Sequence, residues 1–191
     1  MKEIDNRVRV TKMFIRQALL TLLKEKPLQN ITVRELCQAA GINRGTFYTH
    51  YRDIYDLMEQ IEEELTEEFQ NKMTPLLSGN KNIDLVDMIT EIFSLIQNNA
   101  ELCLVTLSPY GDKSFLFRLV AIGKEVGMRA YASLYPDCDP KVMDYFYTFI
   151  SSGCIAILEQ WLKEGMKVPV EELAIIVKGF IAGGAPFMQS N

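Results

Sequence analysis

Apolar side chains recur at helical spacing along nearly the whole chain, with no convincing alternation of apolar and polar residues typical of a strand. Near the N-terminus, Ile15, Leu19 and Leu22 share one face of a helix predicted over residues 6–26, which Pro27 ends. The same spacing predicts further helices over residues 53–73, 84–98, 101–107, 113–134, 140–163 and 170–182. The pattern therefore predicts an all-α protein.

Two short helices with clear end signals are predicted between the longer ones. Thr32 and Glu35 form a capping box, and Gly41 suits the left-handed conformation that closes a helix. Asn43 is then a good N-cap for a second short helix, residues 44–51. Two short helices joined by a tight glycine turn are typical of a helix-turn-helix, whose second helix enters the DNA major groove.

The second short helix has a face that suits DNA. Phe47 and Tyr51 lie four residues apart and are predicted to face the core, so their neighbours point outward. Arginine, tyrosine and threonine side chains can reach phosphates or base edges, and a glycine permits close approach. The alternative is a helical hairpin within a bundle, with ordinary polar surface residues. The predicted DNA contacts are Thr32, Arg34, Arg44, Gly45, Thr46, Tyr48, Thr49, His50 and Arg52.

Charge is unevenly distributed along the chain. The formal net charge is −5, with 48% hydrophobic and 24% charged residues. The first 55 residues nevertheless hold ten Lys and Arg against five Asp and Glu, so this segment is basic and the remainder is acidic. Such an asymmetry favours a nucleic-acid contact surface joined to an acidic body.

Other function classes lack their sequence signals. The four cysteines have no metal-site spacing, there is a single histidine, and we find no nucleophile motif or phosphate-binding glycine loop. We therefore predict no catalytic residues, no metal and no cofactor, and we do not expect an enzyme. Without a signal-peptide pattern or an apolar run of ~18 residues, a cytoplasmic protein with no membrane contact is expected.

The segment from Val10 to Leu57 resembles the DNA-binding domain of TetR-family transcriptional regulators. The likeness is carried by TVRELCQAAGINRGTFYTHYRDIYDL, residues 32–57. It implies a three-helix helix-turn-helix DNA-binding domain over residues 1–52 and a larger C-terminal helical ligand-binding and dimerisation domain over residues 53–191. It also implies a homodimeric repressor that binds double-stranded DNA at a palindromic operator and is released by a small-molecule effector. Family members commonly carry a phosphate-binding lysine where this chain has Ile54, so that contact is missing or supplied by Arg52.

The last two predicted helices favour a dimer. The helix over residues 140–163 is apolar around most of its circumference, which indicates core on one side and a partner subunit on the other. The alternative is a monomer that buries both helices in one core. The predicted interface residues are Phe149, Ile157, Trp161, Leu173, Val177 and Phe180.

An effector cavity among the body helices is also predicted, from aromatic residues at helical spacing. The acidic surroundings favour a cationic or neutral ligand over an anion. The alternatives are that these residues form plain core, or that a regulator of the same fold is controlled by a partner protein or by oxidation of Cys37 or Cys103. The candidate lining residues are Phe93, Tyr110, Phe115, Phe117, Tyr131 and Tyr147.

Overall fold

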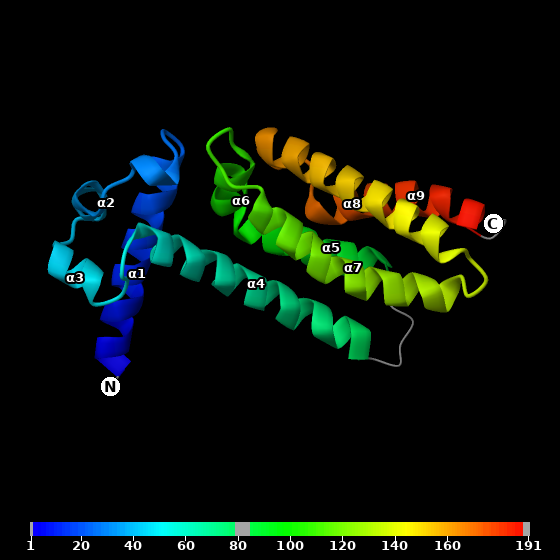
Figure 1. Cartoon of the computed structure of the whole chain (residues 1–191), viewed down its shortest axis with the longest axis horizontal. Coiled ribbons are helices and arrows are strands. Elements are labelled where there is room, and N and C mark those ends of the chain that lie inside the picture. Colours follow the sequence, from blue (N-terminus) through cyan, green and yellow to red (C-terminus); the bar gives the residue numbers. More distant parts are fainter. Residues whose placement is uncertain (1, 79–84, 189–191) are drawn as a thin grey trace. The chain divides into compact units, whose positions relative to one another are not determined.

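The computed structural model describes residues 2–78 and 85–188, and every regular element within these ranges is helical (Figure 1). The all-α prediction is therefore confirmed. The elements are α1 (Lys2–Leu23), the 3-10 helix η1 (Leu28–Asn30), α2 (Val33–Ala40), α3 (Arg44–Tyr48), α4 (Ile54–Ser78), α5 (Leu85–Asn98), α6 (Ala100–Leu107), α7 (Ser114–Leu134), α8 (Pro140–Lys163) and α9 (Val170–Met188).

The chain forms two compact units. The first comprises residues 1–65 together with residues 101–113, so α6 packs with the N-terminal helices. Its core is built from the predicted stripe of α1 and from α2, α3 and α4. The fully buried side chains of these helices are Ile15, Leu19, Leu36, Phe47, Leu57 and Leu65. Whether the DNA-binding domain ends at residue 52 as an independent fold stays a prediction.

The second unit comprises residues 66–100 and 114–191, in which α5 packs on α9, α7 on α8, and α8 on α9. The rings of Phe93 on α5 and Trp161 on α8 stack with their centroids 6.2 Å apart. The indole N–H of Trp161 donates to the carbonyl oxygen of Val168 at 2.8 Å, so this buried donor is satisfied. Trp161 therefore anchors α8 to α5 and to the turn that precedes α9.

Several helix ends differ from the predictions, among them both ends of α1, which spans Lys2–Leu23 instead of residues 6–26. Helix α3 ends at Tyr48 with Thr49 as its C-cap, one turn before the predicted end. Helix α4 continues through Pro75, and α9 continues through Gly183 and Gly184. A Cβ built on Gly184 would lie 2.8 Å from Cε2 of Phe146, so glycine lets α9 approach α8 closely. This packing offsets the weak helix propensity of glycine, about 1 kcal/mol relative to alanine.

Candidate nucleic-acid interface and effector cavity

Local hydrogen bonds set the angle between α2 and α3. Thr32 Oγ1 accepts the backbone N–H of Glu35 at 3.3 Å, as the capping box predicts. Gly41 has φ +67°, and the N–H of Ile42 donates to the carbonyl of Cys37 at 3.0 Å, which closes α2 in the left-handed turn. A hydrogen bond from Lys26, assisted by the backbone N–H of Thr32, lowers the pKa of Glu35.

Helix α3 is fixed at its start and on its inner face. Asn43 Oδ1 accepts the backbone N–H of Thr46 at 2.8 Å. Phe47 is completely buried, and its ring centroid lies 5.6 Å from that of Tyr51, which is also buried. The prediction that Phe47 and Tyr51 face the core is confirmed. A helix of five residues is thus held by a cap and two buried rings.

The opposite face of α3 is open. Arg44 and Thr49 are exposed there, as is Arg34 on α2, and Tyr48 has 57% of its surface accessible. Among the residues that the structure describes, neither Arg34 nor Arg44 has an ion-pair partner. The helix-turn-helix therefore exposes the guanidinium groups of Arg34 and Arg44, without ion-pair partners, and the hydroxyl of Tyr48. All three are groups that bind the phosphates of DNA.

The two threonines of this face have local partners. The hydroxyl of Thr46 donates to Asn43 Oδ1 at 3.1 Å, and that of Thr49 donates to the carbonyl of Thr46 at 2.6 Å. Each must exchange this bond before it can donate to a phosphate oxygen. A Cβ on Gly45 would lie 3.2 Å from Asn43 Oδ1, so glycine also protects the cap. His50 is half-buried with its ring edge-on to Tyr51.

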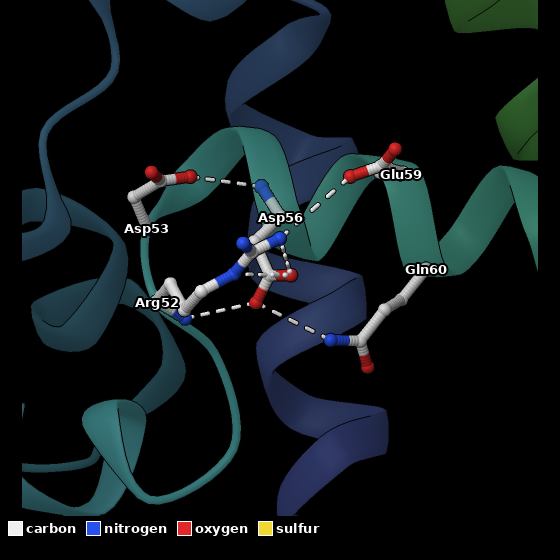
Figure 2. Close-up of polar contacts among 5 residues, drawn as sticks. All are labelled: Arg52, Asp53, Asp56, Glu59 and Gln60. Carbon is white, nitrogen blue, oxygen red and sulfur yellow. Dashed lines mark hydrogen bonds and ion pairs between the residues drawn. The ribbon is translucent and has the colours of Figure 1, made fainter.

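Arg52 is tied into the connection between α3 and α4, as Figure 2 shows. Its guanidinium donates to Asp56 Oδ1 through Nη2 at 2.9 Å and Nε at 3.2 Å, while its backbone N–H donates to Asp56 Oδ2 at 2.8 Å. Gln60 donates to the same carboxylate at 3.3 Å, and Asp53 accepts the N–H of Asp56 at 2.8 Å as the N-cap of α4.

This network neutralises the charge of Arg52. The backbone and side-chain hydrogen bonds from Arg52 lower the pKa of Asp56, and the bond to Asp56 raises the pKa of Arg52. Glu59 Oε2 lies a further 4.0 Å from Nη2. Arg52 is exposed, but carboxylates surround its charge, unlike that of Arg44.

The second unit contains a cavity of about 170 Å³, lined by residues of α4, α5, α7, α8 and α9. Of the six predicted lining residues, Phe93 and Tyr147 contribute to its wall. Phe115 is buried elsewhere, Tyr110 and Phe117 are exposed, and the side chain of Tyr131 lies outside the described ones. The sequence reasoning missed Ser151 and Cys154, which join Tyr147 along one face of α8.

The predicted interface residues divide into two groups. Phe149 on α8 and Phe180 on α9 expose 76% and 66% of their surface. Ile157 is half-buried, whereas Trp161, Leu173 and Val177 are buried in the chain's own core, where α5, α8 and α9 meet. Further exposed apolar residues on the same two helices, which the sequence reasoning missed, are Tyr145, Ile175 and Ile176.

Both cysteines of the predicted redox alternative are buried. Burial raises the pKa of the Cys103 thiol to about 12, and it also raises the pKa of Cys37. Oxidation proceeds through an accessible thiolate, so both positions are poorly suited to sensing oxidants. Within residues 2–78 and 85–188, no cluster of potential metal ligands is present, and no helix is apolar and long enough to cross a bilayer.

The N-terminal and C-terminal segments of the chain each match a model of a known protein family. Residues 15–61 match the family model for bacterial regulatory proteins of the tetR family. Residues 84–183, just over half of the chain, match the model for a transcriptional regulator C-terminal region, which is a TetR model as well. An uncharacterized HTH-type transcriptional regulator of Bacillus subtilis (strain 168), YxbF, is 36% identical over 53 residues. That stretch covers 28% of this chain and only 14% of YxbF.

Solved structures share the fold over nearly the full length. A TetR transcriptional regulator from Streptococcus agalactiae 2603V has a TM-score of 0.58 at 24% identity, covering 94% of this chain and 98% of that one. FadR from Bacillus subtilis in complex with stearoyl-CoA has a TM-score of 0.67 at 14% identity, covering 90% and 98%. The solved structures share the fold, and the matches of both segments to the family models establish that the chain belongs to the TetR family of transcriptional regulators.

Proposed function

We propose that this regulator is a homodimeric repressor that binds a palindromic operator through α3 and is released by a small molecule bound in the cavity. The observation that carries DNA binding is the outward face of α3. Arg44 and Tyr48 stand exposed on a helix held rigidly by the Asn43 cap and the buried Phe47. Rigid placement favours binding because little conformational entropy is lost when the helix enters the groove.

A dimer is supported by the exposed apolar residues of α8 and α9, namely Tyr145, Phe149, Ile175, Ile176 and Phe180, here called the α8–α9 face. Gly179 and Gly183 on α9 have open space where a Cβ would stand, so a partner helix can approach closely. An exposed apolar patch on two adjacent helices suits a four-helix interface around a two-fold axis. A two-fold symmetric dimer also suits a palindromic operator, whose half-sites lie one helical turn, ~34–36 Å, apart.

Effector control is supported by the way the chain runs between its two units. The cavity wall includes Ile96 near the end of α5 and Leu116 near the start of α7. The segment between these helices, residues 101–113, packs in the N-terminal unit. Its Glu101 accepts hydrogen bonds from Gln17 at 2.8 Å and Lys24 at 3.0 Å on either side of the end of α1. These bonds lower the pKa of Glu101 and keep it charged. A displacement of α5 and α7 by ligand is thus transmitted to α6 through the chain itself, and the hydrogen bonds of Glu101 connect α6 to α1.

The ligand must bind the released state more tightly than the DNA-bound state, and the size of the population shift sets how much free energy this difference must supply. Shifting a two-state equilibrium from 1:99 to 99:1 requires about 5.5 kcal/mol of differential affinity.

A coenzyme A ester such as the one bound by FadR is a poor candidate for the effector of this chain. Its phosphates need cationic partners, and none of the described residues that line the cavity is charged.

The test of DNA binding is a titration of the purified protein on the DNA that flanks its own gene. Tyr48→Phe is expected to lower affinity at least about 100-fold on both that DNA and unrelated DNA, because each subunit of the dimer loses one hydrogen bond to a charged phosphate, which contributes about 1.5–3 kcal/mol regardless of sequence. Tyr55→Phe removes a hydroxyl from a similarly exposed tyrosine on α4 and serves as the control, with affinity unchanged.

Equal loss in both variants would mean that tyrosine hydroxyls act through stability rather than contact. If the wild-type protein shows no preference for its flanking DNA over unrelated DNA, the operator lies elsewhere or the proposed function fails. Fragments from across the genome, selected by the same protein, distinguish these two outcomes.

A further inference from the structure

The polar atoms of the cavity wall are concentrated on one helix face. Tyr147, Ser151 and Cys154 follow the spacing i, i+4 and i+7 on α8, and so they line one stripe of the cavity. The other described lining residues are aliphatic or aromatic residues, methionines and one glycine. A bound molecule therefore has a weakly polar side, at α8, and apolar surroundings elsewhere.

Each of the two hydroxyls of this stripe already donates its one hydrogen to a backbone carbonyl of the protein. Tyr147 Oη donates to the carbonyl of Val120 at 3.1 Å, and Ser151 Oγ donates to the carbonyl of Thr148 at 3.2 Å. A hydroxyl has one hydrogen to donate and two lone pairs that accept. What remains available to a ligand at both positions is the lone pairs, so these two hydroxyls accept hydrogen bonds from a ligand rather than donating them.

The stripe also carries no charge at neutral pH. Burial raises the pKa of Tyr147 to about 12 and that of Cys154 to about 11, so both groups stay protonated. An ionised ligand group would lose its hydration in this cavity and gain no counter-charge from the described wall, which is strongly unfavourable.

The space available limits the ligand's size. An engineered protein cavity of about 150 Å³ accepts one benzene molecule, and the cavity here has about 170 Å³. Part of this space exists because position 123 is glycine. A Cβ at Gly123 would lie 3.4 Å from Tyr147 Oη and 3.8 Å from Cζ of Phe69, beside the accepting hydroxyl.

We infer that the cavity binds a small, uncharged, single-ring or similarly compact apolar molecule bearing one hydroxyl, such as a phenol or an alcohol, whose O–H donates to Tyr147 or Ser151. Gly123 leaves room for that hydroxyl. The inference rests on the proposed role of the cavity as the effector site, and it narrows the ligand to one chemical class.

The test is calorimetric titration of the full-length protein without DNA, using three probes of similar size. Para-ethylphenol and para-methylanisole are isomers with the same molecular formula, but only the phenol can donate a hydrogen bond. Para-toluate is a ring of similar size that carries a negative charge. We expect para-ethylphenol to bind about three- to tenfold more tightly than para-methylanisole, the value of one net hydrogen bond. Para-toluate is expected to bind at least about 100-fold more weakly than the phenol.

Variants assign the preference to the named groups. Tyr147→Phe combined with Ser151→Ala is expected to abolish the preference for the phenol, while Tyr55→Phe, outside the cavity, leaves it unchanged. Gly123→Ala is expected to weaken para-ethylphenol binding about tenfold because its methyl group occupies the space beside Tyr147. The same change is expected to raise the Tm by about 2–4 °C through helix propensity, so lost binding cannot be ascribed to unfolding.

The inference is overturned if para-ethylphenol does not bind, if para-methylanisole binds equally well, or if the Tyr147 and Ser151 variant keeps the preference. None of these measurements involves DNA. Selective phenol binding by a protein that ignores operator DNA would therefore overturn the proposed function and leave the ligand class standing.

Discussion

Replacing Phe180 by aspartate is expected to convert the homodimer into a monomer and to lower operator affinity at least about 100-fold. Phe180 exposes 66% of its surface on α9, beside Ile176 and the small Gly179. In a two-fold interface each substitution occurs twice, so two carboxylates would be buried without partners. A monomer then engages one half-site with one recognition helix and loses the gain from simultaneous binding.

Sedimentation equilibrium measures the oligomeric state, and an operator titration measures the loss of affinity. Phe14→Asp is the matched control, since Phe14 is a half-exposed phenylalanine on α1, outside the α8–α9 face. It receives the same change in charge and polarity and is expected to remain dimeric. A Phe180→Asp protein that sediments as a dimer would show that the α8–α9 face is not the subunit interface.

The helix-turn-helix could be predicted from sequence because its determinants act over three to six residues. Thr32 caps a helix through an N–H three residues away, Asn43 does the same, and Gly41 adopts its own backbone conformation. Such interactions depend on spacing along the chain alone. The ion pair of Arg52 with Asp56 likewise joins residues only four positions apart, so the sequence itself indicates that the two can pair.

The cavity and the α8–α9 face could not be predicted residue by residue, because both depend on which helix faces meet. Phe93 and Phe115 are both buried aromatic residues on helices, yet only Phe93 reaches the cavity. When a helix is apolar on all sides, its period does not distinguish an inward residue such as Trp161 from an outward one such as Phe149. The missing information is tertiary packing, which the periodicity of single helices does not contain.

Arg44→Ala is expected to weaken operator binding about ten- to 100-fold and to reduce the slope of log K against log salt concentration by about two, one for each subunit of the dimer. Arg44 is exposed at the start of α3 and has no ion-pair partner among the described residues. Its full charge is available to displace a counterion from a phosphate, and the slope counts such displacements.

Arg52 provides the contrast within the same DNA-binding unit. Its guanidinium is held by two hydrogen bonds to Asp56, so the pair carries no net charge toward DNA. Arg52→Gln combined with Asp56→Asn removes this pair without altering the net charge, and the asparagine oxygen can still accept the backbone N–H of residue 52. We expect the salt slope of this double variant to equal that of the wild type. A slope reduced by about two in the double variant, with no reduction in Arg44→Ala, would mean that Arg52 leaves Asp56 to bind phosphate and supplies the contact that Ile54 cannot make.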